Sequence, residues 1–261
     1  MIVKNNWKYK RVINRLLSYL SAIPWLLRVI TFGIYIVRYL LRKMTPPKAD
    51  NRGGIILNTA FNLLYVGNPK VASSTMKRLF LNDIPGSEFF LDASYNTYIK
   101  RDERSEDMFH FSFVRDPIER IYSCWKDKIS TKQRAADIFI ITRFKGLYPN
   151  MPFDDFVDWL CSEEGSDDYA DRHWISQAKL YESDASSNTK LHLYPLNEIQ
   201  AVIHMLMDKR GLTVPVSMNA NQMRTSQREL ASISDTTCDK IKKRYANDFA
   251  LLSDIKEQSA H

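Results

Sequence analysis

Cysteine, glycine and glycosylation signals are scarce or missing in this sequence, and each absence excludes a class of protein. The chain has 261 residues but only three cysteines, Cys124, Cys161 and Cys238. They are too few and too scattered for a disulfide framework. They also lack the C-x-x-C spacing that many structural zinc sites use. With 8 Gly and 10 Pro against 13 Tyr and 13 Phe, the chain is not collagen-like, linker-like or disordered. A globular protein of one large domain or two small ones is expected.

The excess of basic residues is confined to one end of the chain. The net charge of +7 comes from 37 Lys and Arg against 30 Asp and Glu. Residues 1–52 contain 11 of the basic residues and one acidic residue, Asp50, so this arm has a net charge of +10. The remaining 209 residues contain 26 basic and 29 acidic residues, a net charge of −3. An acidic body does not fit a nucleic-acid-binding domain, and no nucleic-acid partner is predicted.

The basic arm has the pattern of a membrane-surface segment. Its apolar stretch, residues 16–37, is long enough for a transmembrane helix, but Arg28 interrupts it and basic residues flank both ends. At helical spacing, basic and polar residues form one stripe and apolar residues the opposite one, on both sides of Pro24. Residues 1–45 are therefore expected to lie as two amphipathic helices on an anionic membrane. A true span and packing against the body are the alternatives, and a cleavable signal peptide is not expected.

After a linker-like segment at residues 45–54, the apolar pattern alternates between strands and helices. Strands are predicted at three short apolar runs, residues 61–67, 109–114 and 190–194. Helices are predicted where apolar residues recur at helical spacing, over residues 73–81, 117–128, 153–160, 198–209 and 239–252. Strands that alternate with helices are typical of an α/β fold whose sheet is mainly parallel. The chain is thus divided into an arm, residues 1–52, and a folded domain, residues 53–261.

The first predicted strand runs directly into the turn GNPKVASST, residues 67–75. Backbone N–H groups at the start of the following helix, together with the helix dipole, favour an anion there. Lys70 adds a full positive charge, and Ser73, Ser74 and Thr75 add hydroxyl donors. The turn is not a Walker A motif, since G-x-x-x-x-G-K-[ST] is absent. The alternative is an ordinary helix start that Ser73 or Ser74 caps, with Lys70 in solvent.

The segment FVRDPIERIYS, residues 113–123, repeats the order of strand, turn and helix. Asp116 as the N-cap, Pro117 at the first helical position and Glu119 at the third form a strong helix start. Capping does not account for Arg115, at the end of the strand, or for Ser123, two turns into the helix. These two side chains are candidates to hold a second phosphate, with paired hydrogen bonds from the guanidinium.

Together, PKVASST and FSFVRDPIERIYS resemble the paired signature motifs of the membrane-type carbohydrate sulfotransferases. The first motif is most similar to that of the heparan and dermatan 2-O-sulfotransferases, and the chondroitin-type members share the framework. DRHWISQ and YANDF, at residues 171–177 and 245–249, resemble further segments of the family, so the resemblance covers about residues 61–252. It implies a P-loop-NTPase-like sulfotransferase fold with a central, mainly parallel sheet flanked by helices. It also implies 3′-phosphoadenosine 5′-phosphosulfate (PAPS) as the sulfuryl donor.

The resemblance further implies roles for single residues. The first motif would bind the 5′-phosphosulfate of PAPS, and the second would bind its 3′-phosphate. The residues implied in donor binding are Pro69, Lys70, Val71, Ala72, Ser73, Ser74, Thr75, Arg115 and Ser123. Lys70 would also act in catalysis by neutralising the leaving oxygen. Sulfuryl transfer is an in-line displacement whose catalysis depends mainly on positioning and electrostatics. No metal is predicted.

A general base must take the proton of the acceptor hydroxyl. His173, which lies in a polar stretch, is the best candidate. The other internal histidines are expected to be packed in apolar patterns: His110, His192 and His204. The 2-O-sulfotransferases carry a catalytic His between the two motifs, whereas residues 82–108 contain none. Asp92 or another carboxylate is therefore the alternative base.

The acceptor that the resemblance implies is a hydroxyl of a glycan or glycolipid. Aromatic platforms and basic residues often contact such acceptors, and the candidates here are Trp174, Trp125, Lys126, Lys128, Lys132 and Arg134. A solvated helix face is the favoured interpretation of the last four. The sequence has no N-x-[ST] sequon and no Cys in the segment after the His-Trp pair. These absences favour the cytoplasmic face of a bacterial membrane, with a Golgi membrane and a lumenal catalytic domain as the alternative.

Two other functions stay open at this point. One is a P-loop-like kinase that uses ATP, against which the missing Walker A motif counts. The other is a non-catalytic binding module at a membrane surface.

Overall fold

The computed structural model describes most of the chain after residue 48. The described residues are 33, 49–91, 93–99, 108–130, 137, 140–141, 143–182, 190–212 and 227–259. The predictions for residues 1–45, which include the two amphipathic helices and their membrane contact, lie outside these ranges except at Gly33. Within the described ranges, no helix has both the length and the apolar character that a membrane crossing requires.

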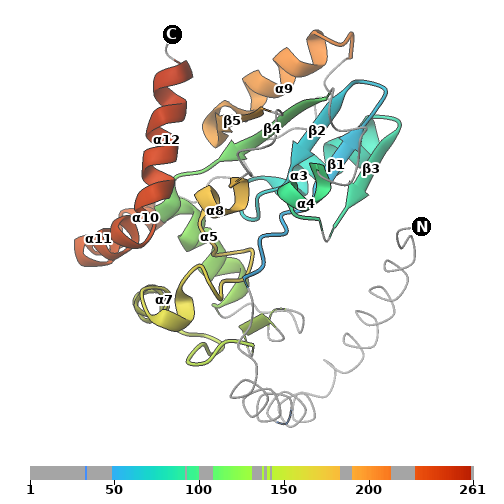
Figure 1. Cartoon of the computed structure of the whole chain (residues 1–261). Coiled ribbons are helices and arrows are strands. Elements are labelled where there is room, and N and C mark those ends of the chain that lie inside the picture. The colour runs from blue at the N-terminus through green and yellow to red at the C-terminus, as the bar shows by residue number, and fades with distance from the viewer. Residues whose placement is uncertain are drawn as a thin grey trace.

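Five strands form one mixed sheet in the order β3-β1-β2-β4-β5 (Figure 1). They are β1 (Ile55–Asn58), β2 (Leu63–Val66), β3 (Ser87–Phe90), β4 (Phe109–Val114) and β5 (Leu191–Pro195). β4 pairs in parallel with both β2 and β5, while β1 pairs antiparallel with β2 and β3. The predicted α/β fold with a parallel centre is confirmed. β1 and β3 were not predicted, because β1 directly follows the linker-like segment and β3 has four residues, none of them fully buried.

The end of the linker-like segment is attached to the body. The Asp50 N–H donates to the carbonyl of Ala170 (2.8 Å). The buried carboxylate of Asp50 forms ion pairs with Arg52 (2.7 Å) and Arg172 (3.3 Å). Residues 49–54 therefore belong to the fold and do not behave as a free connection.

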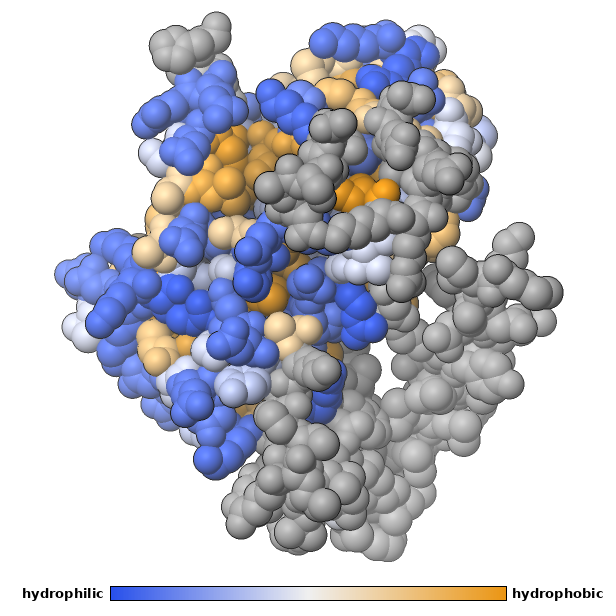
Figure 2. Space-filling model, in the orientation of Figure 1, coloured by the Kyte–Doolittle hydropathy of each residue, from blue (hydrophilic) through white to orange (hydrophobic). Residues whose placement is uncertain are grey.

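The helices are short and cover both faces of the sheet. They are α3 (Ser73–Arg78), α4 (Tyr95–Ile99), α5 (Pro117–Lys128), α7 (Phe153–Leu160), α8 (Gln177–Tyr181), α9 (Ile199–Asp208), α10 (Gln227–Leu230), α11 (Asp235–Arg244) and α12 (Ala246–Ser259). In Figure 1, α9 lies on one side of the sheet and α5, α8 and α12 lie on the other. Figure 2 shows hydrophobic side chains between α12 and α9, where the edge strand β5 lies.

Of the five predicted helices, two have the predicted ends, α9 is one residue shorter at each end than predicted, and two others differ. Residues 117–128 and 153–160 are helical as predicted. The helix expected from Ser73 ends at Arg78 and continues as a π-helical turn. The last predicted helix is two helices, because the chain bends at Tyr245 (φ −113°, ψ 31°). The buried Tyr245 hydroxyl donates to the carbonyl of Trp174 (2.7 Å), a distant partner that the local sequence does not reveal.

The strands separate two hydrophobic cores, because successive side chains point to opposite faces of a sheet. Leu64 and Val66 of β2 belong to the core shared with α5, α7, α8, α11 and α12. Leu63 and Tyr65 belong to the core shared with α3 and α9. The C-terminal ends of β2 and β4 are thus held from both sides at the point where the two motifs begin.

Trp174 is a core residue and not a sugar platform. Its side chain has no exposed surface. It packs against the rings of Phe144, Phe156 and Trp159 at centroid distances of 4.8, 6.4 and 5.8 Å. The prediction that Trp174 contacts an acceptor sugar is therefore wrong, because a ring without exposed surface cannot stack on a ligand.

The chain before β1 and the loop after β2 approach each other closely through glycines. The N–H of Gly67 donates to the carbonyl of Gly54 (2.8 Å). A Cβ atom on Gly53 would lie 1.6 Å from the Gly67 carbonyl oxygen, and one on Gly67 would lie 2.5 Å from the Gly53 oxygen. Only glycine permits this backbone contact, which fixes where the loop after β2 begins.

Replacing Gly53 with Ala is expected to lower the free energy of unfolding by about 2–4 kcal/mol, because the new Cβ forces the two backbones apart. Gly86→Ala is the control. Gly86 has φ +78° and open space around its Cβ position, so its replacement should lower the free energy by only about 1 kcal/mol, through backbone strain. Urea unfolding of both variants measures the difference. Equal losses would show that the close contact does not matter.

Candidate active site

The loop after β2, residues 67–72, has an unusual backbone. Lys70 and Ala72 adopt left-handed conformations, with φ angles of 69° and 53°. For residues with a Cβ, each such conformation costs about 1–2 kcal/mol. Strain of this kind persists where the surrounding structure holds it, and it is typical of functional sites.

The helix that follows this loop begins without a side-chain cap. Ala72 is the N-cap residue of α3, and no side chain accepts a hydrogen bond from the first turn. The alternative interpretation, in which Ser73 or Ser74 caps the helix, is therefore wrong. No hydrogen bond in the described part of the chain uses the N–H groups of Ser73 or Ser74. These two N–H groups, at the positive end of the helix dipole, suit an anion.

Arg115 joins the second motif to the first. It lies at the end of β4, and its guanidinium donates from Nη1 to the carbonyl of Lys70 (3.1 Å) and from Nε to Glu119 (3.1 Å). The side chain is only 5% exposed. Burial lowers the pKa of Arg115 and Glu119 raises it, but a guanidinium stays charged in proteins. Because β2 and β4 are parallel neighbours, their loops leave the same edge of the sheet and the two motifs meet.

The start of α5 forms as predicted. Asp116 is the N-cap, and its Oδ1 accepts from the N–H groups of Ile118 (2.9 Å) and Glu119 (3.1 Å). Pro117 stands in the first turn. Ser123 lies two turns further along the same helix, with a half-buried side chain. The candidate phosphate ligands Arg115 and Ser123 thus come from the residue that follows β4 and from the middle of α5.

A buried amide, which was not predicted, connects the loop after β2 with the end of β4. Gln177, at the start of α8, accepts at Oε1 from the N–H of Arg115 (3.0 Å) and from Nδ2 of Asn68 (2.9 Å). Its Nε2 donates to the carbonyl of Arg115 (2.8 Å). Asp248 of α12 accepts from the backbone N–H groups of Gln177 and Ala178, both at 2.9 Å. Both Gln177 and Asp248 lie in the segments DRHWISQ and YANDF, so the resemblance was the available signal.

A buried arginine supports the same loops from α5. Arg120 has no exposed surface. It donates to three backbone carbonyls, those of Pro69 (3.2 Å), Ile175 (2.8 Å) and Arg172 (3.4 Å). These bonds tie α5 to the first loop and to the segment that carries His173. Arg120 therefore positions the loop after β2 and the segment that carries His173. No local sequence pattern predicts this role.

His173 is held by a buried carboxylate. Its Nδ1 and its backbone N–H both bond to Oδ1 of Asp171, the latter at 3.1 Å. The side chains of His173 and Asp171 are 18% and 4% exposed. Burial raises the pKa of Asp171, but the bonds from His173 outweigh it and the net shift is downward. A carboxylate that is ionised can only accept, so Nδ1 carries the proton and Nε2 keeps its lone pair.

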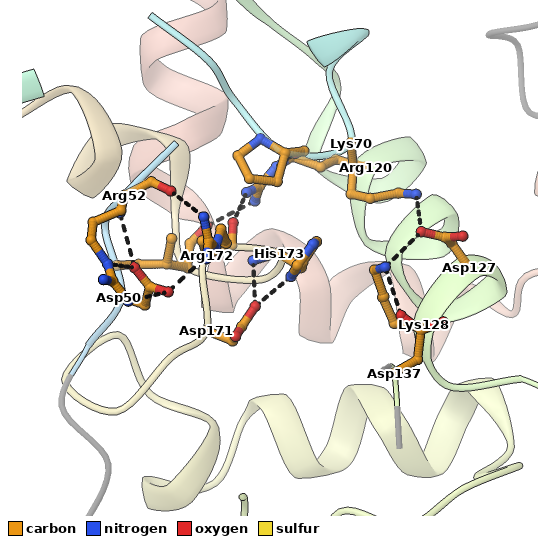
Figure 3. Close-up of polar contacts among 12 residues, drawn as sticks. Asp50, Arg52, Lys70, Arg120, Asp127, Lys128, Asp137, Asp171, Arg172 and His173 are labelled. Atoms are coloured by element: carbon orange, nitrogen blue, oxygen red, sulfur yellow. Dashed lines mark hydrogen bonds and ion pairs between the residues drawn. The ribbon is translucent and has the colours of Figure 1, made fainter. Parts of the chain in front are cut away.

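The environment also keeps the His173 ring neutral. Burial lowers its pKa, and the cation of Lys128 lowers it further, while Asp171 acts in the opposite direction. The net shift is downward, so the ring is uncharged near neutral pH and able to accept a proton at Nε2. Figure 3 shows His173 between Arg172 and the ion pairs of Lys128. Asp92, the alternative base, lies outside the described residues.

The other described histidines have different surroundings. His110 is buried in β4, and its Nδ1 bonds to the hydroxyl of Tyr95 (2.9 Å), as expected for a core residue. His192 stacks on Phe109 with centroids 4.4 Å apart. His204 is exposed on α9, so the prediction that it packs is wrong.

A chain of ion pairs lies beside the first loop, and it changes the interpretation of two lysines. The Lys70 ammonium pairs with Asp127 (3.1 Å), and its side chain is only 16% exposed. Lys128 is buried between Asp127 (3.2 Å) and Asp137 (2.8 Å). A solvated helix face is therefore wrong for Lys128, although it holds for the exposed Lys126, which pairs with Glu229. Lys132 and Arg134 lie outside the described residues.

The described residues contain no group of three or more His, Cys, Asp and Glu side chains placed to hold a metal ion.

A model of the Sulfotransferase family matches residues 54–253, which is 200 of the 261 residues. The matched region begins just before β1 and ends within α12, so it includes both loops, His173 and the buried network of Gln177. The chain belongs to the sulfotransferase family. Neither the curated proteins nor the solved structures include a match to it.

The lowered pKa of His173 predicts a pH-dependent stability. The unfolded chain binds a proton on this His near its ordinary pKa and the folded protein does so only at lower pH. Folding is therefore favoured above the unfolded pKa and weakened as the pH falls below it. The free energy of unfolding should fall between about pH 7 and about pH 5. The fall should be smaller in His173→Gln.

His204→Gln serves as the matched control, because His204 is exposed and this variant should keep the wild-type fall. Urea unfolding at several pH values gives the comparison. An identical pH dependence in His173→Gln and the wild type would contradict the assignment of a neutral, half-buried imidazole.

Proposed function

We propose that this sulfotransferase moves the sulfuryl group of PAPS to a hydroxyl of a glycan or glycolipid. The observation that supports the proposal most is the hydrogen bond between the Arg115 guanidinium and the Lys70 carbonyl (3.1 Å). It makes one site of two cationic loops at the ends of adjacent parallel strands. A ligand with phosphate groups at two ends fits such a site better than a ligand with one.

The chemistry of the hydrogen-bond donors also suits PAPS. The uncapped start of α3 offers the N–H groups of Ser73 and Ser74, and Lys70 adds a charge for the 5′-phosphosulfate. Arg115 and Ser123 would hold the 3′-phosphate, with Pro69, Val71, Ala72 and Thr75 shaping the loop. When bound, PAPS supplies the sulfuryl group. The protein would supply positive charge where negative charge develops on the leaving oxygen, and Lys70 is the residue that we propose for that task.

The acceptor hydroxyl has to lose its proton, and His173 is the proposed base. Its Nε2 is the atom that takes the proton, and the resulting imidazolium is stabilised by Asp171. Asp171 stays ionised throughout and fixes the ring through Nδ1. Lys70 would thereby neutralise the charge on the leaving oxygen, and His173 would take the proton of the acceptor hydroxyl. The two residues are held by separate parts of the fold.

Adenosine 3′,5′-bisphosphate, the desulfated donor, should raise the melting temperature of the protein, and ATP at the same concentration should raise it less. Lys70→Ala should weaken the shift and abolish sulfate transfer, because both binding and transition-state charge depend on this ammonium. Differential scanning fluorimetry and transfer of labelled sulfate measure the two effects. Stabilisation by ATP with magnesium alone would favour a kinase, and stabilisation by neither nucleotide would refute the proposal.

His173→Gln separates binding from chemistry in the same assays. It should keep the thermal shift with adenosine 3′,5′-bisphosphate but transfer sulfate at least about 100-fold more slowly, as expected for loss of a general base. A variant that transfers sulfate at the wild-type rate would leave the base to another group.

The place of action proposed for the enzyme is the cytoplasmic face of a bacterial membrane, with the basic arm on the anionic lipid surface. The net charge of +10 over residues 1–52 supports this. Deletion of residues 1–45 should abolish cosedimentation with vesicles that contain anionic lipid and leave binding of adenosine 3′,5′-bisphosphate intact. Unchanged cosedimentation would refute a membrane role for the arm.

A further inference from the structure

Four charged side chains form an alternating series that ends at the first loop. Asp137 pairs with Lys128 (2.8 Å), Lys128 with Asp127 (3.2 Å), and Asp127 with Lys70 (3.1 Å). Figure 3 shows Lys70 and Lys128 reaching Asp127 from two different segments of the chain. Exposure of the side chains rises from 2% at Asp137 and 9% at Lys128 to 42% at Asp127, and Lys70 is 16% exposed, so Asp127 is the most accessible of the four.

The backbone of Lys70 is fixed independently of its side chain. The residue has φ 69°, and its carbonyl accepts from Arg115. The direction of its long side chain is a separate matter, because a lysine loses much rotamer freedom when its ammonium is ordered. In this structure the carboxylate of Asp127 is the partner that orders it.

Asp127 is well suited to hold two cations at once. Burial raises its pKa, but Lys70 and Lys128 lower it more, to about 2. The carboxylate is therefore ionised throughout the neutral range. Lys128 is itself anchored by the buried Asp137, so Asp127 keeps one cationic partner when the other moves.

We propose that Asp127 is a positioning residue that holds the Lys70 ammonium in the donor-free protein and releases it when the anionic donor binds. This rests on the proposed function, in which Lys70 contacts the 5′ group of the donor. A donor phosphate and Asp127 compete for one ammonium, and their negative charges repel each other. Before binding, Asp127 thus fixes the position of the Lys70 ammonium and neutralises its charge. A ligand binds tightly only if its negative charge is placed well enough to replace Asp127 as the partner of Lys70.

Asp127→Asn keeps the shape of the side chain and removes its charge. Because the competitor for Lys70 is then gone, this variant should bind adenosine 3′,5′-bisphosphate about fivefold more tightly than the wild type. In the Lys70→Ala background the same substitution should have a smaller effect, since it then relieves only the repulsion of the phosphate and no competition for the ammonium. Isothermal titration calorimetry of the wild type, the two single variants and the double variant completes this double-mutant cycle. A merely structural role predicts equal or weaker binding in Asp127→Asn, and that result would overturn the proposal.

Asp239→Asn is the matched control. It removes the same charge from an exposed pair with Lys242 on α11, and it should leave the dissociation constant unchanged. A tightening equal to that of Asp127→Asn would mean that net charge alone is responsible, which would also overturn the proposal.

A second measurement needs no nucleotide and separates this proposal from the proposed function. In the ligand-free protein, an amine-reactive ester should label Lys70 faster in Asp127→Asn than in the wild type, as read by peptide mass spectrometry. Lys128 should stay slow in both, because Asp137 still holds it. Equal labelling of Lys70 would refute the role of Asp127. Absence of nucleotide binding in the wild type, with faster labelling in the variant, would refute the proposed donor and leave the ion pair established.

Discussion

The side-chain amide of Gln177 is the interaction on which the arrangement of the two loops depends. It bonds the backbone of Arg115 through both its oxygen and its nitrogen, and the same oxygen accepts from Asn68. An amide can do this because it carries a donor and an acceptor, whereas a carboxylate of the same shape would place an uncompensated charge in the interior. Asp248 in turn fixes the backbone of Gln177. One hydrogen-bond network therefore joins the loop after β2, the end of β4, α8 and α12.

The first loop departs from local preference, and the rest of the fold supports the departure. Left-handed backbone at Lys70 and Ala72 and a helix start without a cap are each unfavourable in isolation. Arg120 compensates by bonding the Pro69 carbonyl, and Arg115 by bonding that of Lys70. Local rules are broken here in the way expected of a functional site, where binding groups must be left open. An anion at this position would satisfy the N–H groups that a cap would otherwise occupy.

Residues 53–261 have a net charge of −3, so an anion site in this domain depends on where single cations lie and not on an overall positive charge. Its important cations are each paired or buried: Arg115 with Glu119, Lys70 with Asp127, and Lys128 with Asp127 and Asp137. Pairing keeps the site stable without a ligand, and partial exposure of Asp127 leaves Lys70 exchangeable. The neighbouring His173 is kept neutral by burial and by the nearby Lys128. The proposed base, His173, is thus kept uncharged although cationic side chains lie nearby.

The sequence by itself determined the features that depend on neighbours in the chain. The helix start at Asp116 and Pro117, the ends of α5 and α7, and the parallel centre of the sheet all follow from capping, helical spacing and the alternation of strands with helices. Both motifs and His173 could also be found, by chemistry or by resemblance. Only the tertiary structure decided the rest. It paired β1 with β2 and β3, broke the last helix at Tyr245 and buried Trp174 and Lys128. It also brought Gln177 to Arg115, a contact across 62 positions. The physical reason is that burial and ion pairing depend on partners distant in sequence, and no local pattern records which partner a side chain will meet.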